Sequence, residues 1–229
     1  MITIRKANER GHIEHGWLNT YHTFSFGDYH DPEHMHFKSL RVINEDYVKA
    51  NTGFPFHDHM DMEIITYIIT GEIQHKDSLG NTSVIRRGEI QLMRAGTGIT
   101  HSEFNPSKDV DVHLLQIWVI PNVKGLAPLY QQKSFHLVEN IGELVLIASP
   151  DGQNNSFTIA QDAKIYAAII KNTQIDYPIS PNHNVWIQVV EGNLTINGNS
   201  VVSGDGVAII NESNLTINGS GEFILFDLN

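Results

Sequence analysis

The chain has 229 residues, no cysteine and a formal net charge of -11. The absence of cysteine excludes disulfides, thiolate metal sites and a cysteine nucleophile, so any metal must be held by His, Asp, Glu or water. The acidic balance argues against binding to a nucleic-acid backbone, which requires clustered Lys and Arg. The sequence shows neither a signal-peptide pattern nor an apolar run that could span a membrane, so we expect a soluble cytoplasmic protein.

Short β-branched segments, separated by Gly, Asn, Asp or Pro, predict an almost entirely β protein. In the first half of the chain these segments are residues 39–48, 62–77, 83–96 and 111–121, with a hairpin turn expected at 77–81. In the second half they are residues 166–171, 185–198, 206–219 and 222–228. We expect no long amphipathic helix. Many short strands of this kind are typical of β-sandwiches and β-barrels.

The two halves of the chain resemble each other. The stretch "TYIITGEIQ" (66–74) is similar to "IQVVEGNLT" (187–195), and "RRGEIQLM" (86–93) is similar to "VSGDGVAII" (202–210). Such an internal repeat predicts two related β-barrel domains. We place the boundary in the segment 122–145, and therefore expect an N-terminal domain over residues 1–135 and a C-terminal domain over residues 136–229.

Two histidine pairs in the first half suggest a metal site. In a strand, side chains at i and i+2 lie on the same face, so His57 and His59 of "FPFHDHMDMEI" (54–64) can both point inward, and Glu63 can follow them. His101 and Glu103 of "AGTGITHSEFN" (95–105) repeat this spacing. A single pair of this kind is usually a polar turn, but two pairs that antiparallel strands can bring together favour a divalent first-row metal.

Other histidines and several aromatic residues are less informative. We expect His75 to lie at the surface, on a strand beside a turn. Four phenylalanines could form aromatic walls around the site, although ordinary core positions explain each of them equally well; they are Phe24, Phe26, Phe54 and Phe56.

The spacing of these residues resembles that of a known family. The pattern Gly53-x3-His57-x-His59-x3-Glu63-x7-Gly71 resembles the first cupin motif, and Gly88-x7-Gly96-x-Gly98-x2-His101-x3-Asn105 resembles the second. With the longer strings "HDHMDMEIITYIITGEIQHKDSLGN" and "MRAGTGITHSEFNPS", the chain resembles the pirin family of bicupins, especially its bacterial members with quercetin 2,3-dioxygenase activity. The resemblance implies an all-β fold of two jelly-roll cupin barrels packed together.

The resemblance also implies which residues hold the metal. Carried over by position, the ligands are His57, His59, His101 and Glu103, all in the N-terminal cupin. The general cupin pattern would nominate Glu63 in place of Glu103, and in the pirin pattern Glu63 becomes a buried polar residue that needs a hydrogen-bond partner. The corresponding C-terminal positions provide no set of ligands, so we expect that cupin to lack a metal; they are Pro178, Ser180, Asn184, Ile217 and Gly219.

The activity that the resemblance implies is a metal-dependent dioxygenase, which opens the ring of quercetin-like flavonols with O2 to give a depside and CO. Glu103 is then the catalytic base. One divalent metal is implied, with Fe2+ favoured and Cu2+, Ni2+, Co2+, Mn2+ or Zn2+ also compatible with three His and one Glu.

An alternative of another class is an iron-dependent redox sensor or partner-binding regulator of the pirin type, without turnover. Under the enzymatic reading the partners are a flavonol, or another enolisable small molecule, and O2. A protein partner belongs to the regulatory reading. We expect no nucleic acid and no membrane as partner, and a monomeric chain.

Overall fold

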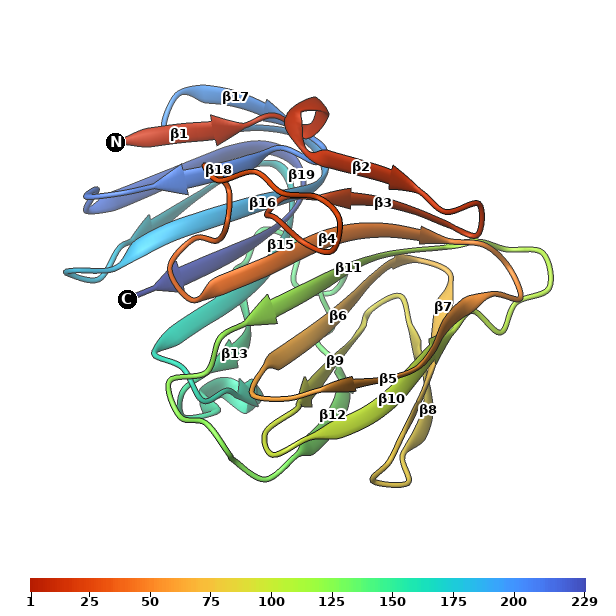
Figure 1. The fold of residues 1–229 in the computed structure, drawn as a ribbon. Coiled ribbons are helices and arrows are strands. Elements are labelled where there is room, and N and C mark those ends of the chain that lie inside the picture. Colours follow the sequence, from red (N-terminus) through yellow and green to blue (C-terminus); the bar gives the residue numbers. More distant parts are fainter. The chain divides into compact units, whose positions relative to one another are not determined.

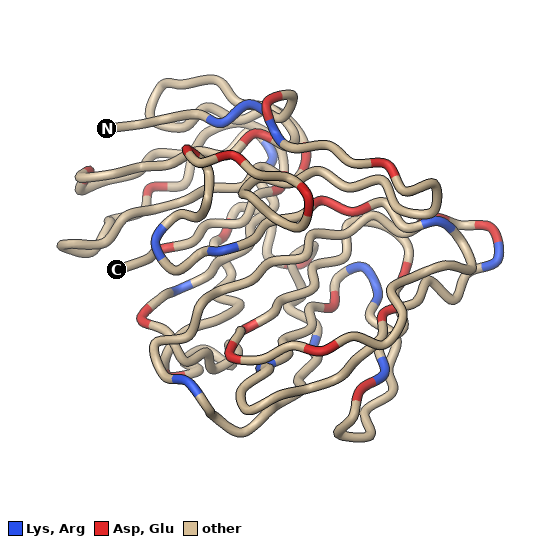
Figure 2. Tube along the Cα trace, in the orientation of Figure 1, with Lys and Arg blue, Asp and Glu red and all other residues tan.

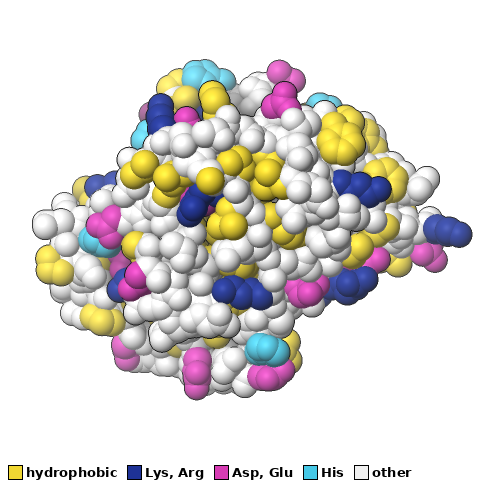
Figure 3. Space-filling view, turned by 90° about the horizontal axis from the view of Figure 1, so that it is seen from below, with side chains coloured by type: hydrophobic (Ala, Val, Ile, Leu, Met, Phe, Trp, Pro, Cys, Tyr) yellow, Lys and Arg dark blue, Asp and Glu magenta, His cyan; other side chains and the backbone are white.

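The computed structural model describes residues 1–229 and is almost entirely β, as the sequence predicts. Its helices are two short 3-10 turns, Ala7–Glu9 (η1) and Gln153–Asn155 (η2). Neither is long or apolar enough to cross a membrane. Acidic and basic residues are scattered along the chain and form no long basic stretch (Figure 2). On the face shown in Figure 3, the charged side chains of both signs are likewise interspersed among apolar ones.

The chain divides into two compact units, Gly11–Phe135 and a unit made of Met1–Arg10 with His136–Asn229. The boundary expected from the sequence instead places residues 1–10 in the N-terminal domain, whereas their contacts group them with the second unit. Strand β1 (Ile2–Arg5) pairs in antiparallel register with β18 (Gly206–Ile209) of the second unit. The side chain of Lys6 is anchored there too, because its Nζ donates to Asp205 Oδ2 at 3.0 Å. This pairing joins residues about two hundred positions apart, which no local pattern reveals.

The unit Gly11–Phe135 consists of two antiparallel sheets (Figure 1). The seven-stranded sheet has the order β12-β9-β6-β11-β4-β3-β2. Its strands are β2 (Gly11–Glu14), β3 (Leu18–His22), β4 (Leu40–Val48), β6 (Glu63–Thr70), β9 (Glu89–Arg94), β11 (Val112–Val119) and β12 (Leu129–Ser134). The four-stranded sheet has the order β5-β10-β7-β8. Its strands are β5 (Gly53–His59), β7 (Glu72–Asp77), β8 (Thr82–Arg86) and β10 (Ile99–Phe104).

The predicted β segment at 62–77 forms two strands, β6 and β7, and these belong to different sheets. Gly71, between β6 and β7, has φ +78°, and a Cβ atom there would lie 2.9 Å from the carbonyl oxygen of Asp111. Only glycine combines this left-handed backbone with so close an approach. The apolar residues that follow the turn pack with those of the seven-stranded sheet, and Ile73 and Ile85 are buried together with Ile68 and Leu114. The two sheets therefore enclose one core, and the space beside that core holds the candidate site.

The second unit is built on one eight-stranded sheet of order β1-β18-β16-β19-β15-β13-β14, with β17 paired to β16. Its remaining strands are β13 (Val145–Ser149), β14 (Phe157–Thr158), β15 (Ala163–Pro178), β16 (Asn184–Ile196), β17 (Asn199–Val202) and β19 (Asn214–Leu228). Register shifts place one extra residue in each of β15 and β16 where they pair with β19, and such bulges bend and twist a strand. The core of this unit is apolar and includes Ile187, Leu194, Ile217 and Phe223, each buried.

Candidate metal centre

The two histidine pairs lie on adjacent antiparallel strands of the four-stranded sheet. His57 and His59 are on β5, and His101 lies directly opposite His57 on β10. The register shifts between His101 and Glu103, where two residues of β5 face one of β10, so Glu103 pairs with Phe54. This bulge places one extra residue in β5. The alternation of side chains between the two faces of the sheet therefore shifts by one residue across the bulge.

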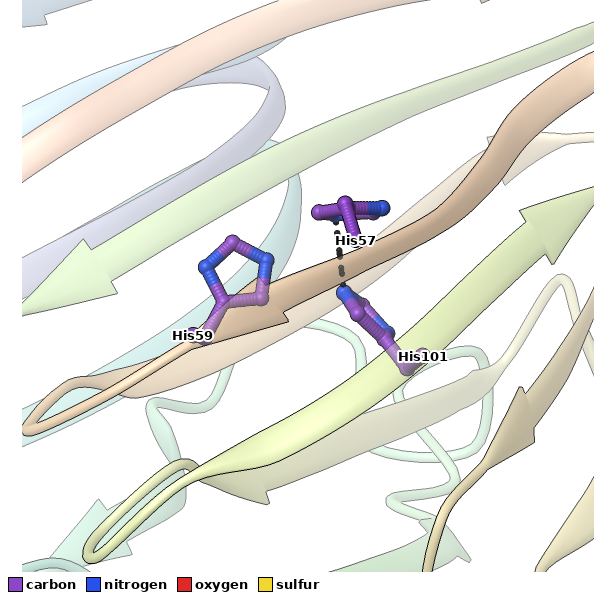
Figure 4. A group of neighbouring side chains, drawn as sticks. All are labelled: His57, His59 and His101. Atoms are coloured by element: carbon purple, nitrogen blue, oxygen red, sulfur yellow. Dashed lines mark hydrogen bonds between the residues drawn. The ribbon is translucent and has the colours of Figure 1, made fainter.

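The rings of His57, His59 and His101 lie around one space (Figure 4). The ring centroid of His59 is 4.7 Å from that of His57 and 4.9 Å from that of His101. Each residue offers one nitrogen, and these three atoms lie within 4.8 Å of one another. Nε2 of His57 and Nε2 of His101 are 3.1 Å apart. Two nitrogens bound at about 2.1 Å and at right angles around one metal lie about 3 Å apart, so this separation fits a shared ion.

Local hydrogen bonding directs a lone pair of His57 into this space. Its Nδ1 lies 2.8 Å from the carbonyl oxygen of Pro55, which can only accept a hydrogen bond, so Nδ1 carries the proton. Nε2 is then bare, which means that it is unprotonated and has a free lone pair. A bare Nε2 is the form that binds a metal. The site is thus arranged for a cation, with donors converging from two strands.

The protonation states of the other two histidines suit a metal as well. Burial, together with the neighbouring imidazoles of His57 and His75, lowers the pKa of His101 to about 3. Burial, followed by the imidazoles of His101 and His57, lowers the pKa of His59 to about 4. Both rings are therefore neutral near pH 7, and metal binding needs no proton release from them.

Glu103 is buried beside the histidines, but it belongs to a different subgroup of ligand atoms. Its carboxylate lies within 4.8 Å of nitrogens of His101 and His75, whereas the group of three histidines does not include it. Oε2 accepts a hydrogen bond from Gln116 Nε2 at 2.8 Å, and Oε1 accepts one from Thr66 Oγ1 at 3.3 Å. Neutral donors on the seven-stranded sheet thus hold the carboxylate next to His101, at the edge of the cluster.

The other candidate carboxylate, Glu63, has a structural partner instead. It is fully buried, and its Oε1 accepts a hydrogen bond from Arg94 Nε at 2.7 Å. Glu63 lies on β6 and Arg94 lies opposite it on β9. Glu63 thus has the hydrogen-bond partner that a buried carboxylate needs.

A cavity of about 270 Å³ opens next to the site. His57, His59 and Glu103 form one wall. The other lining residues are Phe26, Asn44, Asp46, Phe54, Pro55, Gln116 and Trp118. Of the four phenylalanines considered as aromatic walls, Phe26 and Phe54 line the cavity, Phe24 is a core residue with 2% exposure, and Phe56 points outward with 63% exposure. The bulge in β5 explains why Phe54 shares a face with His57 at an odd spacing.

Four residues at the cavity or beside the histidines were not assigned to the site from the sequence. Trp118 packs edge-on against His59 with ring centroids 4.9 Å apart, and Gln116 holds Glu103. Both lie on β11, where Gln116 and His113 interrupt an otherwise apolar strand. Asp46 on β4 lines the cavity. His75 was expected at the surface, and this expectation is wrong, because its side chain has 0% exposure and faces His101.

Asp46 is a carboxyl group in an unfavourable place for a negative charge. Burial raises its pKa from the ordinary value of 3.8 to about 7; the Thr20 hydroxyl opposes this, while the carboxylates of Glu103 and Glu45 add to it. The folded protein therefore binds a proton at Asp46 more tightly than the unfolded chain does. Stability attributable to this group is full below about pH 4 and falls as the pH rises to about 7.

Asp46→Asn should therefore stabilise the metal-free protein at pH 8 and change little at pH 4. The gain at pH 8 has an upper bound of about 4 kcal/mol, since each unit of pKa shift corresponds to about 1.4 kcal/mol. Thermal unfolding of both proteins at the two pH values measures this difference. A melting-temperature change that is the same at both pH values would show that the ionisation of Asp46 is not its cause.

Comparison with known proteins agrees with this geometry. Residues 3–119 match the Pirin family, and residues 146–228 match the quercetinase C-terminal cupin domain. A protein of Escherichia coli named quercetin 2,3-dioxygenase is 47% identical over 100% of this chain and 99% of its own length. A pirin-like protein of Caulobacter vibrioides is 36% identical over 99% of each chain.

A solved structure points to the metal. The crystal structure of a bacterial pirin from Escherichia coli in complex with nickel(II) has a TM-score of 0.95 to this protein, with 46% identity over 100% of this chain and 99% of that one. Together with the three converging histidines, this supports a site for a divalent metal in the unit Gly11–Phe135. From the matches over both halves and the identity over its full length, this chain belongs to the pirin family of bicupins.

Proposed function

We propose that this protein is a metal-dependent dioxygenase that opens the flavonol ring of quercetin-like substrates with O2. The observation that carries the proposal is that His57, His59 and Glu103 line a cavity with aromatic side chains, and that the ring of His101 converges with the rings of the two histidines. The printed name of the 47% identical relative from Escherichia coli supports the same chemistry.

The metal would be held by His57, His59 and His101, with Glu103 as the neighbouring carboxylate. When bound, a divalent metal acts as a Lewis acid that lowers the pKa of a coordinated hydroxyl group. Iron(II) is our preferred metal, and nickel(II) is supported by the complex of the related pirin. Imidazole and carboxylate ligands also accept copper, cobalt, manganese and zinc.

Glu103 is our candidate for the general base. Its carboxylate adjoins the cavity, so a flavonol that presents its 3-hydroxyl group towards His57 and His59 brings that proton within reach of Glu103. The hydrogen bonds from Gln116 and Thr66 orient the carboxylate before the substrate arrives. The proton can remain on Glu103 while the electron-rich flavonolate reacts with O2.

The shape of the cavity suits a small aromatic ligand. Its volume of about 270 Å³ lies just below the range for small-molecule sites, which begins at about 300 Å³. Phe26 and Trp118 pack edge-on with ring centroids 5.3 Å apart, and they form an apolar wall with Phe54. These rings can orient a flat substrate, and they keep water away from the reacting carbons.

The proposed reaction balances without a further reductant. The bonds from C3 to C2 and to C4 break, and C3 leaves with its oxygen as CO. Both atoms of O2 remain in the depside ester, and the proton held by Glu103 returns to the product. O2 is therefore the only oxidant required.

The test is flavonol turnover by metal-stripped protein that has been reconstituted with iron(II), copper(II), nickel(II) or cobalt(II) separately. Loss of the quercetin absorbance band, with equivalent uptake of O2, should occur with one or more metals and not with the metal-free protein. If metal binds stoichiometrically and no form consumes quercetin or O2, the dioxygenase proposal is wrong for flavonols.

A regulatory function without turnover is the second candidate, and one observation favours it. Phe56 and Met60 have 63% and 68% exposure, and they flank the two histidines of β5, which is an edge strand of its sheet. Exposed apolar side chains beside a metal site could present a surface to a protein partner. This reading predicts metal-dependent binding of a partner and no loss of flavonol with any metal.

A further inference from the structure

A buried chain of polar side chains leads away from His101 to two residues that do not line the cavity, His75 and Asp77. Nδ1 of His101 lies 3.3 Å from Nδ1 of His75, and Nε2 of His75 lies 2.9 Å from Oδ2 of Asp77. The side chains of His75 and Asp77 have 0% exposure. The chain His101–His75–Asp77 spans β10 and β7, which are adjacent strands.

The direction of these hydrogen bonds follows from the end that can only accept. An ionised Asp77 has no proton to give, so Nε2 of His75 donates to it. A neutral His75 then has a bare Nδ1, which accepts from Nδ1–H of His101. The neutral His101 is left with a bare Nε2, and this is the nitrogen that lies 3.1 Å from Nε2 of His57.

Asp77 is fixed strongly enough to impose this direction. Its Oδ1 accepts hydrogen bonds from the backbone N–H groups of Leu79 and Asn81, and the side-chain amide of Asn81 donates to both carboxylate oxygens. Burial alone would raise the pKa of Asp77, but the hydrogen bonds from His75 and Asn81 hold it below the ordinary value. The carboxylate therefore stays ionised and stays in place.

His75 is also held by packing. Its ring stacks on Tyr130 with centroids 4.5 Å apart and an angle of 26° between the planes. The hydroxyl group of Tyr130 is in turn hydrogen-bonded to Ser83 and to Gln132. The ring of His75 thus cannot turn freely, and its bare nitrogen remains directed at His101.

We propose that His75 and Asp77 are positioning residues, which fix His101 in the tautomer whose Nε2 lone pair faces the metal. Without this pair, His101 could protonate Nε2 and donate it to His57, which would close the site in the absence of a metal. The proposal rests on the metal centre described above. It extends that centre by two buried residues that neither touch the metal nor line the cavity.

A second metal between His75, His101 and Glu103 is the competing interpretation, since these three also offer ligand atoms within 4.8 Å of one another. It would require lone pairs on Nδ1 of both His75 and His101 at once. His101 would then have to give both of its ring nitrogens to metals, as a deprotonated imidazolate. A neutral ring has only one bare nitrogen, so the hydrogen bond is the simpler assignment.

The first test reads the tautomers in the metal-free protein by nitrogen-15 NMR of the imidazole rings, with His75→Phe and His101→Gln used for assignment. We expect His101 to be protonated on Nδ1 and His75 on Nε2. Protonation of His101 on Nε2, or of His75 on Nδ1, would overturn the proposal. This readout does not depend on metal binding. It therefore tests the positioning of His101 by His75 and Asp77 separately from the metal centre itself.

The second test measures nickel(II) affinity by competition with a chelator. His75→Phe keeps a ring on Tyr130 and loses the hydrogen bonds, and it should weaken binding by about 10–100-fold, the usual effect of removing a partner of a ligating histidine. The matched control is His113→Phe, because His113 also stacks on a tyrosine, Tyr47, and bonds a carboxylate, Glu45, without contacting the site. The control should bind nickel as the wild type does.

A third variant guards against a general loss of structure. Asp77→Asn preserves volume and an acceptor oxygen, and it should weaken nickel binding less than His75→Phe while altering the visible spectrum of cobalt(II)-loaded protein. If His75→Phe and Asp77→Asn both bind nickel as tightly as the wild type, or if the wild type takes up two equivalents of metal, the proposal that His75 and Asp77 position His101 is refuted.

Discussion

Replacing His101 by alanine should abolish stoichiometric binding of a divalent metal. His101 is buried at 1% exposure, and its Nε2 lies 3.1 Å from that of His57, so its removal takes away the donor that joins the two strands. Structural zinc sites are worth about 10–16 kcal/mol over four ligands, so one ligand accounts for about 3 kcal/mol, or roughly a 100-fold change in affinity. Metal content after passage over a chelating resin measures this loss.

The control for this prediction is His113→Ala. That histidine lies on β11, has a carboxylate partner and a stacked tyrosine, and does not belong to the cluster. It should retain a full equivalent of metal. Thermal unfolding of both variants excludes a trivial loss of fold. A His101→Ala protein with the metal content of the wild type would remove His101 from the ligand set.

Replacing Glu103 by glutamine should leave part of the metal bound and eliminate turnover. The three histidines remain, and glutamine has nearly the same volume, so the site keeps its shape. An amide cannot accept the proton of the flavonol hydroxyl group, however, and general-base catalysis contributes about 10²–10⁴-fold to rate. Quercetin consumption per bound metal is the appropriate measurement, because it separates loss of the base from loss of the ion.

Asp58→Asn is the matched control for Glu103→Gln. Asp58 lies between the two histidines of β5, but its side chain is exposed and accepts a hydrogen bond from Thr100 at 2.5 Å. The same carboxylate-to-amide change there should preserve both metal and activity. If Glu103→Gln turned over quercetin at the wild-type rate per metal, another group would have to accept the proton.

The sequence was most informative where the chemistry depends on short spacings. The i, i+2 rule places His57 and His59 on one face, and the repeated spacing at His101 and Glu103 finds the partner strand, as the register of β5 and β10 shows. The β-branched segments likewise predict an all-β chain, because strand propensity and turn residues are local properties. These features need no knowledge of long-range pairing.

The features that the sequence did not reveal depend on contacts distant along the chain. The pairing of residues 2–5 with residues 206–209 has no local signature. Whether the side chain of His75 points into the core or towards solvent depends on the register of its strand. A register shift of one residue would turn it to the other face of the sheet. Asp46 and Gln116 reach the site from β4 and β11, in the sheet opposite the one that carries the histidines.

The most direct test of the dioxygenase proposal is CO release by the metal-reconstituted protein, measured together with quercetin loss and O2 uptake. We expect one CO for each quercetin and each O2 consumed, and no CO from His57→Ala treated in the same way. Loss of quercetin without CO, or CO release that persists after His57 is replaced, would contradict ring opening at this metal centre.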